Sequence, residues 1–148
     1  MADTQRLQPA ARTHGATEVP VLDIVIRSGI VALALATGAI HLTLGGLLFT
    51  LNAIGYFVAA IAMVVPLALA ARFRGLIRLG LIGYAATTIV GWYLMGPRYE
   101  TAYIAKAIEV ALIGLLAIEL RRVDGNPVAI VRGAIGALLA ALRPSTHR

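Results

Sequence analysis

The sequence predicts an all-α membrane protein: a four-transmembrane-helix bundle with a C-terminal interfacial amphipathic helix. Of its 148 residues, 59% are hydrophobic and only 14% are charged, and the mean hydropathy is +0.86. A small soluble domain cannot bury that much apolar surface. The apolar stretches are also long enough to cross the ~30 Å hydrocarbon core, which takes about 20 helical residues. We expect residues 1–22 to form a polar N-terminal segment, residues 23–122 the bundle, and residues 123–148 a cytoplasmic-side amphipathic helix and tail.

The first half of the bundle should be a helical hairpin. From Ile24 to Ala71 the chain is apolar almost without a break, which is about twice the length of one span. Gly45-Gly46 is the natural turn. It predicts one helix over residues 24–44 and a second over residues 47–71. Pro66 should kink the second helix, because proline lacks an N–H and clashes with the preceding turn.

The second half should contain two more spans and a shorter helix. Residues 76–95 form the third apolar run, which Gly96-Pro97 ends, and residues 101–120 form the fourth. Asn126-Pro127 then combines a good N-cap with a residue suited to the first helical turn. The helix that starts there should lie in the membrane plane, because one face is apolar and the rest carries arginine. That apolar face consists of Val128, Val131, Ile135, Leu138, Leu139 and Leu142.

The arginines predict the orientation. They gather before the first span, between the second and third, and after the fourth, whereas the other two connections hold only Arg98. The positive-inside rule then places both termini in the cytoplasm, and the Gly45-Gly46 turn and residues 96–100 outside. Around that outer loop lie Trp92, Tyr93, Tyr99 and Tyr103, the composition of an interfacial aromatic belt.

Lys106 and Glu109 stand inside the fourth apolar run. An ionisable residue at the centre of an inserting helix costs roughly 2.5–3.5 kcal/mol, so packing, pairing or function must offset it. At 1.5 Å per residue they lie about 9 and 13 Å from the outer boundary, three residues apart on one helical face. His41 and Asn52 fall in the same outer half of the first and second helices. These four residues are the candidates for one binding site.

Each candidate also has a purely structural interpretation. Lys106 can extend its ammonium to the outer interface, or it can pair with Glu109. Glu109 can be a neutral, hydrogen-bonded acid, or it can serve a ligand, a proton or a partner. His41 can be a packed histidine and Asn52 a contact between helices. Glu119 is expected to be an ordinary charge at the inner interface.

Several classes of function receive no support from the sequence. The chain has no cysteine, which excludes disulfides, thiolate metal sites and cysteine nucleophiles. We find no catalytic motif, no metal site and no nucleic-acid-binding pattern. A haem between helices commonly needs two histidines, whereas only His41 lies in a span. We therefore predict a protein that is not an enzyme, and its cofactor, if it has one, is unknown.

Four segments of this chain resemble small, uncharacterised bacterial four-helix integral membrane proteins. They are His41-Leu42, LLFTLNAIGYF at residues 47–57, GWYL at residues 91–94 and the acid of AKAIEVAL at residues 105–112. The resemblance covers residues 24–120, implies a four-span protein of the bacterial inner membrane, and draws attention to His41 and Glu109 as a pair. It implies no activity.

Two functions remain open from the sequence. The first is a non-enzymatic accessory or structural subunit of a larger membrane complex, docking a partner, a lipid or a hydrophobic cofactor. Its partners would be membrane lipids and either other membrane subunits or further copies of the chain. The alternative is a small transporter or proton-relay protein that uses Glu109, Lys106 and His41.

Overall fold

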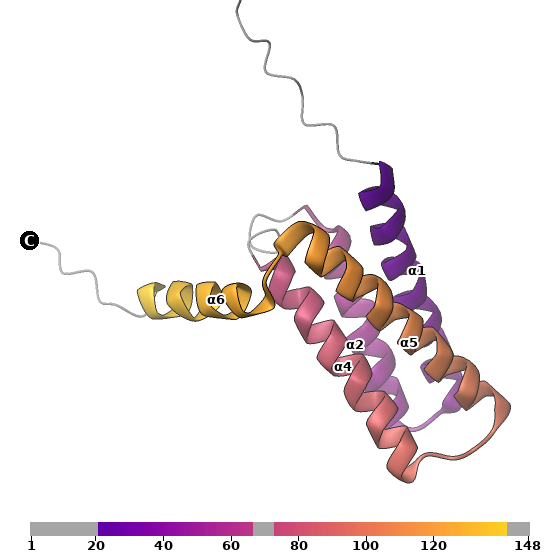
Figure 1. Cartoon of the computed structure of the whole chain (residues 1–148). Helices are drawn as coiled ribbons and strands as arrows, with labels where there is room; N and C mark the ends of the chain where they lie inside the picture. The colour runs from indigo at the N-terminus through magenta and orange to yellow at the C-terminus, as the bar shows by residue number, and fades with distance from the viewer. Residues whose placement is uncertain (1–20, 67–72, 142–148) are drawn as a thin grey trace, which may run out of the picture.

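The computed structural model describes residues 21–66 and 73–141, and this part of the chain is all-helical, without strands (Figure 1). Four of its helices are long and apolar enough to cross a membrane, which confirms that part of the prediction. The helices in order are α1 Val21–Leu44, α2 Leu47–Val64, α4 Arg74–Met95, α5 Glu100–Glu119, the π-helical turn η1 Leu120–Asp124, and α6 Pro127–Ala141. Most of the polar N-terminal segment and the end of the tail lie outside the described residues.

The predicted glycine turn joins α1 and α2. Gly45 and Gly46 have φ angles of +70° and +86°, values that cost little without a Cβ. α2, however, ends at Val64, so the prediction of a kinked helix that continues through Pro66 is wrong. Val65 is already extended, with φ −62° and ψ 127°, the conformation that a following proline imposes. The rest of the predicted helix, residues 67–71, lies outside the described residues.

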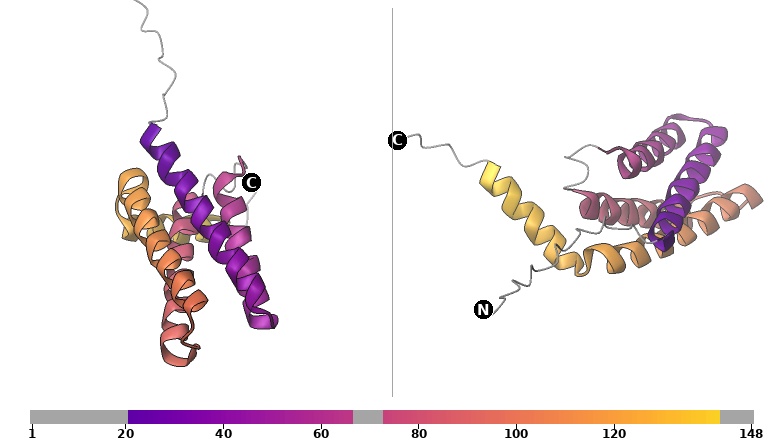
Figure 2. Two further views of the ribbon diagram at one scale, coloured as in Figure 1. Left: turned by 90° about the vertical axis from the view of Figure 1, so that its right-hand side faces the viewer. Right: turned by 90° about the horizontal axis from the view of Figure 1, so that it is seen from above.

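The four long helices form an antiparallel bundle in which α1 and α5 each pack closely against two neighbours. α1 packs against α2 and α5, and α5 packs against α4, whereas α2 and α4 meet less closely along a seam (Figures 1 and 2). The core consists of Ile26, Ile30, Ala34, Tyr56, Ala60, Met63, Leu81, Ala85, Leu112 and Leu116. We call the end with residues 45–46 and 96–99 the loop end, and the end with Val21, Arg74 and Asp124 the α6 end.

One face of α1 packs into the core. Ile26, Ile30 and Ala34 follow one another at intervals of four residues and are buried. Ser28 and Ala32, which share another face of the helix, are exposed.

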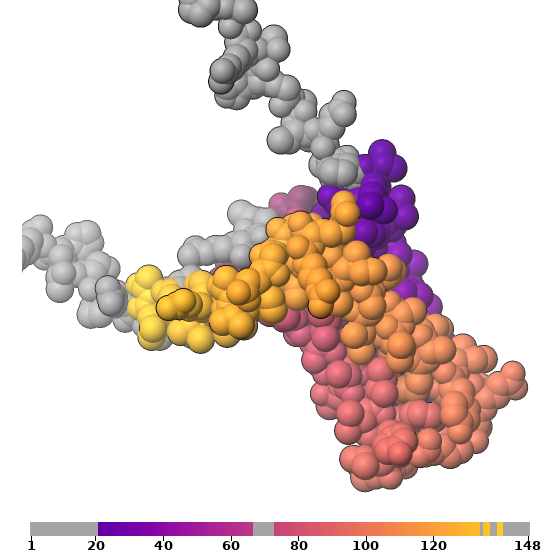
Figure 3. Space-filling view, in the orientation of Figure 1, coloured from indigo at the N-terminus to yellow at the C-terminus, as the bar shows by residue number. Residues whose placement is uncertain are grey.

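α6 leaves the bundle at the α6 end and extends sideways from it (Figures 1 and 3). Gly125, at φ +73°, makes the bend. The Asn126 side chain accepts a hydrogen bond of 2.9 Å from the Val128 amide, so the predicted N-cap is confirmed. Val128, Ile135 and Leu139 are all more than half exposed. α6 thus presents an apolar surface that the described chain does not cover, as the interfacial prediction requires; that prediction itself stays untested.

Candidate functional site

Glu109 is the centre of a buried polar cluster to which all four long helices contribute. Its side chain is fully buried. Carboxylate oxygen Oε2 accepts a 2.7 Å hydrogen bond from Thr88 of α4, and Oε1 accepts one of 3.3 Å from Thr37 of α1. The Tyr56 hydroxyl of α2 lies 3.2 Å from that of Thr88. A buried carboxylate thus finds partners on every side, as a charge away from water must.

Lys106 turns inward and pairs with this carboxylate. Its Nζ lies 2.7 Å from Glu109 Oε2, and 12% of the lysine side chain is exposed. Of the two interpretations of Lys106, the structure shows pairing rather than extension to the interface. The separation of three residues places the two side chains on one helical face. The cluster therefore contains a buried ion pair with one partner close to the surface.

His41 completes the cluster in a defined orientation. Its Nδ1 lies 2.8 Å from the Thr37 carbonyl oxygen, so Nδ1 must carry a proton and donate it. Nε2 lies 3.7 Å from Glu109 Oε1. A bare Nε2 and a carboxylate oxygen repel each other, since both are acceptors. Nε2 thus faces the Glu109 carboxylate at a distance longer than a hydrogen bond.

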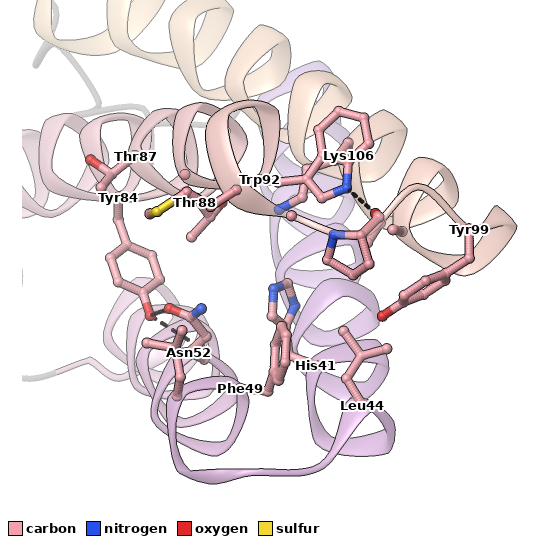
Figure 4. A pocket seen from close by; sticks show the side chains of 17 residues that line it. His41, Leu44, Phe49, Asn52, Tyr84, Thr87, Thr88, Trp92, Tyr99 and Lys106 are labelled. Carbon is pink, nitrogen blue, oxygen red and sulfur yellow. Dashed lines mark hydrogen bonds between the residues drawn. The ribbon is translucent and has the colours of Figure 1, made fainter.

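A cavity of about 340 Å³ opens beside this cluster at the loop end (Figure 4). His41, Thr88 and Lys106 line it, and the rest of its wall is mostly apolar and aromatic. It lies along the seam between α2 and α4. Tyr84 bridges that seam by donating a 2.8 Å hydrogen bond to the Asn52 side chain, so Asn52 does join two helices as expected. Asn52 lines the cavity but is not a partner of Glu109.

The four aromatic residues predicted to form a belt all lie near the loop end. Trp92 donates a 2.9 Å hydrogen bond to the Pro97 carbonyl (Figure 4), and its ring meets Tyr103 edge-on with 5.1 Å between centroids. The Arg98 guanidinium lies 4.6 Å from the Trp92 ring centroid. Tyr93 and Tyr99 are exposed. Trp92 thus lines the cavity and is hydrogen-bonded to the loop that follows α4.

A second ionic cluster lies at the α6 end, and sequence reasoning missed it. Glu119 is 1% exposed, so the prediction that it is an ordinary interfacial charge is wrong. Its carboxylate accepts two hydrogen bonds from buried Arg78, of 2.9 and 3.0 Å, and one of 3.1 Å from Arg27. Arg78 also donates to Asp124 at 2.5 Å. The bidentate geometry is the one in which arginine binds a carboxylate most specifically.

The helical spacing of residues on α5 could have predicted the burial of Glu119. Glu109, Leu112, Leu116 and Glu119 follow one another at intervals of three, four and three residues, and all are buried. Residues with this spacing share one face of a helix. Because Glu109 was expected to face the bundle, Glu119 should have been expected there too.

No group of three or more His, Cys, Asp or Glu side chains among the described residues is arranged to hold a metal ion. Comparison with known proteins gives no family: no family model, no curated protein and no solved structure matches this chain. The site must therefore be interpreted from its own chemistry.

Proposed function

We propose that this protein is a non-enzymatic membrane protein that binds a lipid or another amphiphile in the loop-end cavity. The observation that carries the proposal is the cavity itself: a mostly apolar wall with His41, Thr88 and Lys106 among its lining residues. Ligand sites of about this size typically combine apolar walls with a few placed polar groups. The apolar part of the ligand would lie along the α2–α4 seam, and its polar head would accept a hydrogen bond from Lys106.

The ligand head should be an acceptor, and an anionic one binds best. Lys106 has three donors, of which Glu109 Oε2 takes one at 2.7 Å. The partly exposed ammonium can donate another to a carboxylate or carbonyl oxygen in the cavity. A charge-assisted contact of this kind is about twice as strong as a neutral one.

The structure favours binding over transport through the bundle. Glu109 and Glu119 are ten residues apart on α5, which is about 15 Å of helix. Between them Leu112 and Leu116 are fully buried. The other buried polar residues of the described chain, Thr37, His41 and Arg78, belong to the cluster at one end or the other. A proton entering at Lys106 would have no buried polar group to continue to at the level of the two leucines. The transporter or proton-relay alternative therefore stays a prediction, and the buried residues between Glu109 and Glu119 offer it no chain of polar groups.

The single tryptophan offers a direct test, since Trp92 lines the cavity. The probe is dibromostearate, whose bromines quench a nearby indole, titrated into detergent-solubilised protein. We expect saturable quenching in the wild type. Gly91→Leu should abolish it by filling the cavity, since Gly91 lines the cavity and no atom lies within 4 Å of the place where its Cβ would stand.

Gly83→Leu is the matched control. Gly83 lies on the same helix with equal free space around its Cβ position, and it does not line the cavity. Lys106→Met should weaken binding about tenfold or more, the usual size of a hydrogen bond between charged groups. Equal quenching curves for the wild type and Gly91→Leu would refute the proposed site.

Whether the protein is an accessory subunit of a membrane complex is tested separately from lipid binding. Native-gel migration after mild detergent extraction, with mass spectrometry of co-migrating proteins, tests it. A chain that migrates alone with bound lipid would favour a lipid-binding protein over a subunit of a complex.

A further inference from the structure

A second cavity, of about 360 Å³, lies at the α6 end, on the opposite side of the apolar core layer from the proposed lipid site. Arg27 and Ser28 of α1 and Arg74 of α4 line it together with Asp23. Its remaining wall is apolar and comes from Ile24, Val31, Met63 and Val64. Two guanidinium groups from different helices therefore share one concave surface.

The acid in this cavity is already neutralised. Asp23 Oδ1 accepts hydrogen bonds of 3.1 and 3.0 Å from Arg122, so its charge is compensated from outside the cavity. Arg27 uses only its Nε, which lies 3.1 Å from Glu119, and a third of its side chain is exposed. The outer nitrogens of Arg27 form no ion pair with an acid among the described residues. The cavity thus has an excess of positive charge.

Arg74 supplies the observation that points to a ligand. Its Nε is buried, yet it has no hydrogen-bond partner among the described residues. A buried donor left unpaired is unfavourable, and native structures contain few of them. Every other arginine of the α6-end ionic network finds a carboxylate, as Arg27, Arg78 and Arg122 do. Among the described residues, Arg74 is thus the arginine lining this cavity that has no acidic partner.

We propose that this cavity binds a phosphate group, held by Arg74 and Arg27 with the Ser28 hydroxyl as a further donor. The guanidinium fork matches the oxygens of a phosphate in geometry as well as charge. Phosphate here means either the headgroup of an anionic phospholipid or a soluble phosphate ester. The apolar wall beside the arginines suits the glycerol and first methylenes of a lipid, and the cavity lies where the apolar helices end.

Arg74→Gln is the primary variant, because Arg74 has no ion pair in the described structure to lose. Arg121→Gln is the matched control: it removes the same charge from an exposed residue at the same end. Native mass spectrometry of the detergent-solubilised full chain measures retention of phosphatidylglycerol, with a phosphate-free diacyl glycolipid as the competing lipid. We expect Arg74→Gln to weaken phosphatidylglycerol binding about tenfold and Arg121→Gln to change it less than twofold.

A second experiment tests soluble ligands, inorganic phosphate and glycerol phosphate, and measures thermal stabilisation of the protein. If these ligands stabilise the wild type in an Arg74-dependent way as strongly as the lipid does, the site takes a soluble phosphate. If only the lipid binds, the site takes a headgroup. Both results support a phosphate site.

Two results would overturn the proposal: equal loss of phosphatidylglycerol binding in Arg74→Gln and Arg121→Gln, or retention of the phosphate-free lipid that falls in Arg74→Gln as much as that of phosphatidylglycerol. Lipid held in the loop-end cavity does not depend on Arg74, which lines only the α6-end cavity of the two. Should Arg74→Gln not give folded protein, Arg74→Lys supplies the test. It keeps the charge but loses the Nε donor and the fork, so unchanged phosphatidylglycerol binding in that variant would also overturn the proposal.

Discussion

Replacing Glu119 by glutamine should be among the most destabilising conservative changes in the bundle. The carboxylate joins α5 to two other helices through Arg78 and Arg27. Glutamine is nearly isosteric, but its amide nitrogen is a donor. One of the two Arg78 bonds would therefore become a contact between donors, and Arg78, itself fully buried, would keep its charge.

The expected loss of unfolding free energy depends on which contacts Arg78 and Arg27 keep in Glu119→Gln. Removing one partner of a buried ion pair costs about 3–5 kcal/mol. Arg78 retains its contact with Asp124, at 2.5 Å, which moves the expectation to the lower end. Arg27 is one-third exposed, so solvent screens its loss to about 1 kcal/mol at most. We expect Glu119→Gln to lower the free energy of unfolding by about 3 kcal/mol.

Unfolding in mixed micelles, driven by titrated dodecyl sulfate, measures this difference. The control is Asp23→Asn, which breaks the 3.0 Å pair with Arg122, a side chain that is 41% exposed; such a pair contributes about 0.2–1 kcal/mol. Replacing Arg78 and Glu119 together by leucine should cost less than Glu119→Gln alone, since no fully buried charge remains; Asp124 loses Arg78, but 18% of its side chain is exposed. If Glu119→Gln unfolds like Asp23→Asn, Glu119 is an interfacial charge after all.

Three further predictions concern the cluster at Glu109, the C-terminal helix and the topology. Glu109→Gln and His41→Ala should be non-additive by at least about 0.5 kcal/mol in the same unfolding assay, because their side chains lie 3.7 Å apart; strict additivity would mean that they do not interact. Truncation after Asp124 should leave the bundle folded and inserted while weakening its contact with anionic vesicles, since α6 is largely exposed; failure to insert would make α6 part of the bundle. Reporter fusions after Arg148 should report the cytoplasm and fusions near Gly45 the outside; the reverse pattern at both would reject the charge argument.

The sequence was sufficient for the four long helices, for two helix boundaries and for the placement of Lys106 beside Glu109. Gly45-Gly46 and Asn126-Pro127 predicted their turn and cap because these residues favour specific backbone conformations. Lys106 and Glu109 were expected to be neighbours because three residues separate them on one helix. Local chemistry decided each of these features, and local chemistry is what a single sequence contains.

Features that depend on how helices rotate against one another were not predictable in the same way. Depth along the helix brought His41 and Asn52 to the same level, but only the structure shows that His41 faces Glu109 whereas Asn52 faces Tyr84. Arg78 lies near the start of the third apolar run, and its burial depends on Glu119, which is 41 residues away. A partner at that distance in the chain cannot be identified from helical spacing on one segment.

The distribution of these contacts explains where the cavities lie. α5 is joined to α1 and α4 by charged groups at both ends, through Glu109 at the loop end and Glu119 at the α6 end. α2 has no ion pair among the described residues, and its side-chain hydrogen bonds to α4 in this part of the chain come from Tyr56 and Asn52. Both cavities include residues of α2 and of α4 in their walls. The helix with the weakest polar attachment therefore borders both spaces, and a ligand that fills either one would stabilise the bundle where its own side chains hold it least.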